Sequence, residues 1–282
     1  MQHGPLVWRV GEHEVDCSSR TLVMGILNRT PDSFSDGGRL ADTSAAVERA
    51  LQMVAEGADI LDVGGESTRP GSDPVPADEE MARTVPVVRR LAAELPEVPV
   101  SIDTRKAEVA AEALAAGASI VNDVSAGRDP DMFGVVAVTG AGMVLMHMLG
   151  EPKTMQVEPR YEDVVVDVKA FLKERLEAAV SARIEQERLC VDPGIGFGKT
   201  LEHNLALMRD IRSFFELGRP VLAGPSRKAF VGKLLDLDVD ERLEGTAGAV
   251  AWLAGQGVHI VRVHDVKEMA RAVRVVDAIR GT

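Results

Sequence analysis

Residues 98–123 read VPVSIDTRKAEVAAEALAAGASIVND, and this stretch decides the fold because it holds one complete repeat of it. An apolar run at 98–102 precedes an Ala-rich segment of helical character at 106–116, and a second apolar run covers 119–121. Gly117 stands where the C-terminal cap of the helix is expected. A strand, a helix and a second strand in this order predict a βαβ unit with parallel strands.

The same alternation extends along the chain in both directions. Short apolar runs, mostly rich in Val, Ile and Leu, predict eight buried strands at 22–27, 60–63, 98–102, 119–121, 143–146, 189–191, 221–223 and 260–263. We expect helices between them at 43–56 with Thr43 as its cap, and at 106–116, 161–187, 242–256 and 266–279. Before the first strand, 6–10 and 13–17 predict a small hairpin that turns at Gly11 and Glu12.

Eight strands alternating with about eight helices favour an α/β fold of the TIM (β/α)8 barrel type, and an open doubly wound sheet is the alternative. Nearly every expected strand runs into polar residues: Asn28, Asp62, Asp103, Asn122, Asp123, His147, Asp192, Ser226, Arg227, Lys228, Arg262 and His264. In a barrel these strand ends converge on one face, whereas in an open sheet the outer ones lie too far apart to share a ligand. We therefore predict one domain over 1–282, with a hairpin at 1–18 and a barrel at 19–282.

Composition limits the class of protein. The chain has 282 residues, 45% of them hydrophobic, which is enough for one large core. A net charge of −12 argues against nucleic-acid binding, which relies on clustered cations. Cys17 and Cys190 lack metal-ligand spacing and are expected to be reduced thiols. Residues 1–17 lack the apolar core of a signal peptide and no run reaches about 18 apolar residues, so we expect a cytoplasmic protein without a membrane span.

Two loops near the N-terminus carry groups suited to an anion and its counterion. Asn28 ends the first strand and offers an amide oxygen that suits a hard cation such as Mg²⁺, although an Asn at this point can also cap a turn. After the second strand, Thr68 and Arg69 follow a pair of glycines and can grip an anion. Arg69 alone can equally be a solvated surface charge.

The third, fourth and sixth strands end in acceptors. Asp103 and Asn122 fit a donor-rich planar ring such as a pterin, with the alternative that Asp103 caps the next helix. The stretch DPGIGFGKT at 192–200 resembles a phosphate loop but has Pro193 where the first Gly of that motif belongs. Its glycines are therefore expected to shape a pocket floor around Asp192 and Phe197.

The last two strands end in cations and a histidine. Arg227 and Lys228 follow the seventh strand, and Arg262 and His264 lie on or after the eighth. Loops after these strands bind anions in many barrels, so we expect a diphosphate here. His259 is expected to be an ordinary core histidine, while the role of His147 stays open.

Taken together, these loops resemble dihydropteroate synthase. The matching stretches are MGILNRTPDSFSDGG, DVGGESTRPGS, SIDTRK, VNDVSAG, MHMLGEPKTMQ, DPGIGFGKT, GPSRKAF and RVHDV, which occur in the family's order and spacing from residue 24 to 266. The resemblance implies a homodimeric TIM barrel that joins p-aminobenzoate to (7,8-dihydropterin-6-yl)methyl diphosphate, giving 7,8-dihydropteroate and pyrophosphate. Its partners would be these small molecules, with no nucleic acid and no membrane.

The resemblance also implies a role for each matching residue. Asn28 would meet Mg²⁺ on the diphosphate. Asp103, Asn122, Asp192 and Lys228 would hold the pterin. Arg69, Arg262 and His264 would hold the diphosphate and neutralise its charge. Thr68, Ser226 and the loop around Phe34 and Pro70 would help form the p-aminobenzoate site, which sulfonamides occupy, and Phe197 would line the substrate pocket. The residues expected to be catalytic are Asp103, Asp192, Lys228, Arg262 and His264.

Two positions depart from the family's pattern and keep other functions open. Arg29 replaces a small apolar residue after Asn28, and Leu149 replaces a polar residue after Met146-His147-Met148. Arg29 is similar to what divergent relatives carry, so a non-catalytic or divergent pterin-binding paralogue is one alternative. A pterin-dependent methyltransferase is another, although it would not need Lys228, Arg262 and His264 for a diphosphate.

Overall fold

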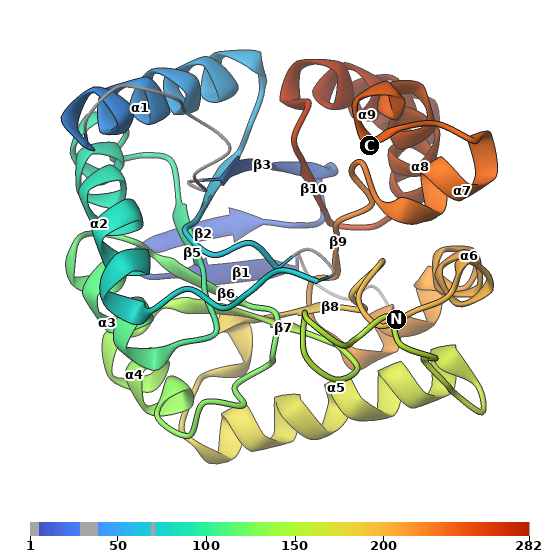
Figure 1. The fold of residues 1–282 in the computed structure, drawn as a ribbon, viewed down its shortest axis with the longest axis horizontal. Helices are drawn as coiled ribbons and strands as arrows, with labels where there is room; N and C mark the ends of the chain where they lie inside the picture. The colour runs from blue at the N-terminus through green and yellow to red at the C-terminus, as the bar shows by residue number, and fades with distance from the viewer. Residues whose placement is uncertain (1–5, 29–38, 69–70, 282) are drawn as a thin grey trace.

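Eight parallel strands surround a common axis and close into a barrel in the computed structural model, which describes residues 6–28, 39–68 and 71–281 (Figure 1). The strands are β3 (Leu22–Asn28), β4 (Ile60–Gly64), β5 (Val100–Asp103), β6 (Ile120–Asp123), β7 (Gly142–Met146), β8 (Leu189–Asp192), β9 (Leu222–Ala223) and β10 (Ile260–Val263). They pair in the order β8-β7-β6-β5-β4-β3-β10-β9, and a parallel bridge between Val191 and Val221 joins β8 to β9. The predicted TIM barrel is confirmed, and the open sheet is excluded because its two edges meet.

Helices form the outer layer around these strands (Figure 1). They are α1 (Arg39–Glu56), α2 (Ala77–Glu94), α3 (Ala107–Ala115), α4 (Met132–Thr139), α5 (Val164–Ser181), α6 (Leu201–Arg209), α7 (Ala229–Leu235), α8 (Leu243–Gln256) and α9 (Val266–Arg280). Short 3₁₀ segments are η2 (Gln186–Arg188), η3 (Ile211–Leu217) and η4 (Val239–Glu241). No helix in the described ranges is both long and apolar enough to cross a bilayer.

Two of the predicted helices had wrong boundaries. Helix α1 begins at Arg39, so Thr43 lies inside it and does not cap its N-terminus. The helix expected at 161–187 is α5, which begins after Asp163 caps the backbone N–H groups of Val165 and Val166. It ends at Ser181 because the chain turns at Arg183, whose φ of 73° is outside the helical range. Gly57, Gly117 and Gly257 adopt positive φ after their helices, as helix-ending glycines should.

The N-terminal hairpin closes the amino end of the barrel. Strands β1 (Val7–Val10) and β2 (His13–Asp16) pair antiparallel, as predicted. Trp8 and Val10 are fully buried against inward-facing apolar residues of the barrel, which include Leu22, Met24, Ile60, Ile120, Val144, Cys190, Leu222 and Ile260. The Trp8 indole N–H donates to the Arg188 carbonyl at 2.9 Å, and the Gly11 N–H donates to the Gly140 carbonyl at 3.2 Å. We call residues 7–17, which are this hairpin and the buried Cys17 that follows it, the hairpin plug.

The polar side chains point into the barrel one layer closer to its carboxyl end than the residues that contact the hairpin plug. Side chains alternate between the two faces of a strand, so positions two residues apart share a face. Ile60 is therefore followed inward by Asp62, Ile120 by Asn122, Cys190 by Asp192 and Ile260 by Arg262. The intervening Leu61, Val121, Val191 and Val261 pack outward against the helices. The strand register thus delivers a set of polar side chains to the carboxyl end of the barrel.

Candidate active site

Arg262 is the centre of a buried polar cluster at the carboxyl end of the barrel. Its Nε donates to Asp62 Oδ2 at 2.5 Å, and its Nη2 donates to Asp103 Oδ2 at 2.6 Å. Asn122 Nδ2 donates to the same Asp62 oxygen at 3.1 Å. Asp62 is fully buried, and Asp103 and Asn122 are nearly so. The barrel therefore unites side chains from β10, β4, β5 and β6 in one hydrogen-bonded network.

The carboxylates in this network retain unused accepting capacity. Asp62 Oδ1 and Asp103 Oδ1 are buried and have no hydrogen-bond partner among the described residues. Burial raises the pKa of Asp103 to about 7, against the opposing effect of Arg262 and with a further upward contribution from the Asp62 carboxylate. Such oxygens suit a ligand that presents N–H donors. Asp103 does not cap α3, because the Ala107 N–H at the start of that helix donates to Asp129 instead.

The loop after β8 forms a second wall. Asp192 accepts a hydrogen bond from the Gly194 N–H at 2.7 Å, and burial raises the pKa of its carboxyl to about 6. Gly194 has a φ of 70°, and a Cβ on it would lie 2.0 Å from the His147 carbonyl oxygen, so no other residue fits this turn. Phe197 packs in a small buried cluster with Val124, Met146, Met148 and Met155. The wall is thus apolar beside the Asp192 carboxylate.

Lys228 joins this wall to the loop after β9. Its ammonium lies 3.9 Å from the centroid of the Phe197 ring, which is a cation–π contact. The same ammonium is close enough to Asp192 to lower the pKa of that carboxyl, although burial outweighs it. Lys228 therefore reaches across the pocket toward Asp192 at the end of β8 and Phe197 in the loop that follows it.

His147 and Lys199 form a buried pair behind this wall. Lys199 Nζ lies 3.0 Å from His147 Nδ1 and donates to the Phe197 carbonyl at 2.9 Å. Burial lowers the pKa of Lys199 to about 7 and that of His147 to about 3. The His147 ring also packs edge-on against Phe171, with 4.9 Å between ring centroids. Both groups shape the loop from behind, and His147 behaves as a satisfied structural histidine.

The residues after β9 and β10 meet at the carboxyl end of the barrel. Ser226 Oγ lies 3.0 Å from His264 Nδ1 and accepts the His264 backbone N–H at 3.2 Å. Arg227 is committed elsewhere, since its guanidinium makes two hydrogen bonds to Asp265, at 3.0 and 2.5 Å. Burial, reinforced by the charges of Arg262, Arg227 and Lys228, lowers the pKa of His264 to about 3. These influences disfavour a positive charge on the His264 ring, against the expectation that this residue helps to neutralise the diphosphate.

The loop after β4 is tied down by a buried ionic network. Glu66 forms ion pairs with Lys106 and with Arg105, the latter at 3.1 Å, and Lys106 also pairs with the fully buried Glu80. Glu66 additionally accepts the Val75 N–H at 3.2 Å, which closes the base of the loop. This network holds the half-buried Thr68 next to the cluster's strand ends. Arg29, Phe34, Arg69 and Pro70, which sequence reasoning placed near the site, lie outside the described residues.

Asn28 lies at the edge of the same pocket. A Cβ built on Gly64 would lie 3.6 Å from Asp103 Oδ2 and 3.8 Å from Asn28 Oδ1, so both oxygens face the space over this glycine. No group of three His, Cys, Asp or Glu side chains within the described ranges could hold a metal by itself. A cation at this edge would need oxygen ligands from a substrate and water in addition to Asn28.

The structure brings together most of the predicted site and adds two residues that sequence reasoning missed. Asp103, Asn122, Asp192, Phe197, Ser226, Lys228, Arg262 and His264 line one end of the barrel. Asp62 was seen as a strand-end residue but given no role, although its inward position beside Asp103 was a usable signal. Lys199 was considered only as part of a rejected phosphate loop, and no sequence pattern shows that it turns inward.

The chain matches the family of pterin binding enzymes over residues 24–264. It is 45% identical over 272 residues to the dihydropteroate synthase of Synechocystis sp., and the aligned region covers 96% of this chain and 94% of the relative. It is 47% identical over 260 residues to the dihydropteroate synthase of Escherichia coli (strain K12), which covers 92% of each.

Solved structures agree with these sequence relatives. Yersinia pestis dihydropteroate synthase in a sulfonamide drug complex superposes with a TM-score of 0.92 at 42% identity, over 98% of this chain and 100% of the other. Xanthomonas albilineans dihydropteroate synthase with 4-aminobenzoic acid gives a TM-score of 0.92 at 43% identity, over 99% of each chain. The same enzyme with 7,8-dihydropteroate gives 0.87 at 42% identity, over 97% of this chain and 99% of the other.

Proposed function

This chain belongs to the dihydropteroate synthase family of pterin-binding enzymes, and from that membership we propose how its strand-end pocket performs the family's reaction. The reaction joins the amine of p-aminobenzoate to the methylene carbon of (7,8-dihydropterin-6-yl)methyl diphosphate. It gives 7,8-dihydropteroate and releases pyrophosphate. The observation that carries the assignment is the Arg262-centred cluster, which offers acceptors for a pterin on one side and donors for a diphosphate on the other.

Asp103, Asn122, Asp192 and Lys228 bind the pterin in this proposal, with Asp62 holding Asn122 and Arg262 in place. A pterin presents a 2-amino group and a ring N–H side by side, and a buried carboxylate oxygen with accepting capacity suits each of them. Burial of these carboxylates excludes water as a competitor. Phe197 and its methionine neighbours supply the apolar contact that a flat ring needs.

Arg262 and His264 bind the diphosphate, together with Arg69. The two carboxylate contacts fix the Arg262 guanidinium, so it meets the leaving group without first reorganising. Asn28 would hold Mg²⁺ through its amide oxygen, with the remaining ligands coming from diphosphate oxygens and water. When bound, Mg²⁺ would neutralise part of the charge that develops on the departing pyrophosphate.

Positive charge develops on the pterin methylene as its bond to oxygen breaks. The carboxylates of Asp103 and Asp192 lie on the pterin side of the pocket and stabilise that charge electrostatically. Thr68, Ser226, Phe34 and Pro70 help form the p-aminobenzoate site. The aniline nitrogen is neutral near pH 7 and attacks without prior deprotonation. We therefore propose a dissociative substitution with no covalent enzyme intermediate.

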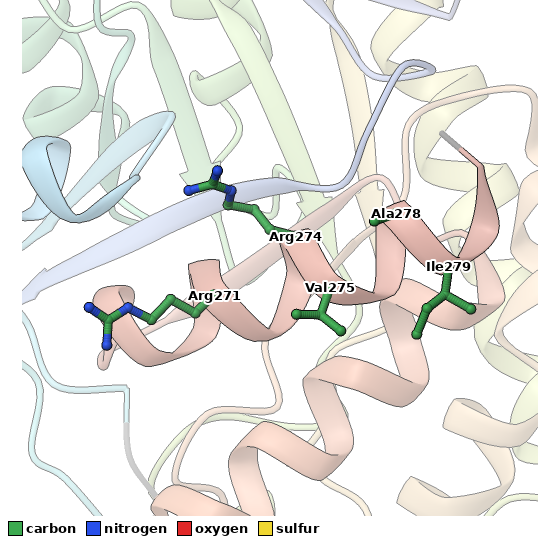
Figure 2. A pocket seen from close by; sticks show the side chains of 5 residues that line it. All are labelled: Arg271, Arg274, Val275, Ala278 and Ile279. Carbon is green, nitrogen blue, oxygen red and sulfur yellow. The ribbon is translucent and has the colours of Figure 1, made fainter.

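A homodimer through α8 and α9 is part of the proposal. Val275 and Ile279 are 61% and 79% exposed on one side of α9, where they line a shallow hollow with Arg271, Arg274 and Ala278 (Figure 2). Trp252 on the adjoining α8 is also half-exposed. Apolar side chains grouped on neighbouring helices are typical of a subunit contact. Sedimentation analysis of the wild type and of Ile279→Asp tests it, and a monomeric wild type would refute it.

A cytoplasmic location completes the proposal. Cys17 and Cys190 are buried free thiols, and burial raises the pKa of Cys17 to about 12, so the chain carries no sign of disulfide chemistry. Fractionation of the source cells tests it.

Pyrophosphate release from the dihydropterin methyl diphosphate, measured with Mg²⁺ and with or without p-aminobenzoate, tests the proposed reaction. We expect release that depends on p-aminobenzoate and yields dihydropteroate. Arg262→Lys keeps the charge but cannot span both carboxylates, so it should lower kcat/KM by about 100-fold or more. Binding of the pterin without any turnover would refute the proposal and make Arg29 the first residue to replace.

A further inference from the structure

The hydrogen bonds between Ser226 and His264 determine where the imidazole carries its proton. Ser226 is almost completely buried, and its hydroxyl has two neighbours within hydrogen-bond distance, the His264 backbone N–H at 3.2 Å and His264 Nδ1 at 3.0 Å. The backbone N–H can only donate, so one lone pair of the hydroxyl oxygen is occupied. The hydroxyl proton then needs an acceptor of its own.

His264 Nδ1 is that acceptor. If Nδ1 carried a proton, the hydroxyl would accept twice and its own proton would face a buried site without a partner, which is unfavourable. A doubly protonated ring is disfavoured for the same reason, and also because the charges of Arg262, Arg227 and Lys228 act against it while, among the described residues, the Asp265 carboxylate favours it. Asp265 is in turn engaged by Arg227. The ring is therefore neutral and its proton is on Nε2.

We propose that Ser226 is a positioning residue that fixes His264 as the neutral Nε2–H tautomer, aimed to donate one hydrogen bond to a diphosphate oxygen. The proposal rests on the function proposed above only for the identity of that acceptor. The two ring nitrogens lie on opposite edges of the imidazole, so an Nδ1 held by Ser226 turns Nε2 away from the loop after β9. No proton is transferred, and the N–H···O bond strengthens as negative charge builds on the leaving pyrophosphate.

This role differs from that of a cationic histidine in a measurable way. An imidazolium would lose its charge as the pH rises through its titration range, and binding of pyrophosphate would weaken with it. A neutral donor stays unchanged over that range. Arg262 supplies the fixed positive charge beside it, which explains how a site in a chain of net charge −12 can hold an anion without an additional titrating cation.

The direct test is the imidazole ¹⁵N spectrum of the full-length enzyme, labelled at its six histidines and recorded with and without inorganic pyrophosphate. His259 is an internal reference, because its Nδ1 accepts the Val221 backbone N–H at 3.0 Å and must be unprotonated. A His264→Gln variant assigns the signal. We expect His264 to match the His259 pattern from about pH 6 to about pH 8. A protonated Nδ1, or a doubly protonated ring near pH 7, would overturn the proposal.

Variants test the part played by Ser226. Ser226→Ala should let the tautomers mix and should lower kcat by about tenfold, while Ser226→Thr keeps the hydroxyl and should restore the Nε2–H pattern and most of kcat. Ser213→Ala is the matched control, since that hydroxyl donates to the Asp210 carbonyl outside the site. Unchanged kcat and an unchanged tautomer in Ser226→Ala would also overturn the proposal. Since the tautomer is measured without substrate, a failure of turnover would refute the proposed reaction alone.

Discussion

The two ends of the barrel are made by the same strands at positions two residues apart, yet they follow opposite physical rules. At the amino end, Trp8 and Val10 of the hairpin plug are fully buried among apolar side chains, and the plug's polar groups find backbone partners. At the carboxyl end, Asp62 and Asp103 are buried with oxygens that have no partner among the described residues. The amino end is mainly an apolar layer, while the carboxyl end holds buried carboxylate oxygens that a ligand could bond.

This difference separates stability from function within a single fold. An apolar layer gains free energy on folding in proportion to the area it buries. Buried carboxylates lower stability unless they are paired, so they are retained where a substrate uses them. Substitutions at the amino end should therefore change unfolding and leave catalysis intact, whereas substitutions at the carboxyl end should do the reverse.

Replacing Trp8 at the amino end should give the largest effect, which is on the free energy of unfolding. Trp8→Ala removes a fully buried indole and its hydrogen bond to Arg188, so we expect a loss of about 3–5 kcal/mol in the free energy of unfolding. The remaining folded enzyme should keep a kcat within about twofold of the wild type, measured at low temperature. Trp252→Phe on the half-exposed α8 is the control and should cost about 1 kcal/mol. A collapse of kcat at unchanged stability would contradict the comparison.

An Asp→Asn substitution made at each end of the barrel sharpens the comparison between the two ends. Asp103→Asn should lower kcat/KM by about 100-fold without lowering the melting temperature, because it removes a charge whose burial is unfavourable, while the amide oxygen can still accept from Arg262. Its matched control is Asp59→Asn, where the carboxylate accepts from Arg20 at 2.8 Å and from the Val23 N–H at 2.9 Å near the amino end. That variant should lose about 1 kcal/mol of stability and retain activity. If both variants behaved alike, the two ends would not differ as argued.

The smallest expected effect is a pH dependence of stability. Burial raises the pKa of Asp103 from its ordinary value of 3.8 to about 7. Between these values the folded chain binds the proton and the unfolded chain has lost it, so this group lowers stability as the pH rises. Asp103→Asn lacks this penalty, and its stability relative to the wild type should increase by on the order of 2 kcal/mol from about pH 5 to about pH 7. Parallel denaturant titrations measure the gap, and a gap that stays constant would contradict the shift.

Much of the fold was readable from local pattern. The eight predicted strands all formed, with ends shifted by one or two residues, because short Val- and Ile-rich runs between helical segments have few other uses. Helices α2, α4, α6 and α7 had no predicted bounds. Helix α2 contains Pro86, which normally argues against a helix, and α4 is a short apolar segment without a polar face. Their helical state depends on packing against the barrel.

Most residues of the site could be predicted from the sequence, but the contacts between them could not. Strand-end position marked Asp103, Asp192, Arg262 and His264, since all strands of a barrel end at one face. The bond between Arg262 and Asp62 joins residues 200 positions apart, and only barrel closure sets that pairing. The lowered pKa of His264 likewise depends on burial and on three cations, Arg262 from β10 and Arg227 and Lys228 from the loop after β9, which no local pattern reveals.

The hairpin plug imposes an order on biosynthesis. Trp8 leaves the ribosome among the first residues, but the carbonyl that receives its indole N–H belongs to Arg188, 180 positions later. At roughly 5–20 residues per second, the hairpin waits roughly 10–40 s before its docking surface exists. Its apolar side chains, Trp8, Val10 and Cys17, reach their buried positions only after that interval. The segment that closes the amino end of the finished barrel can therefore dock only after the strands that bury it have been made.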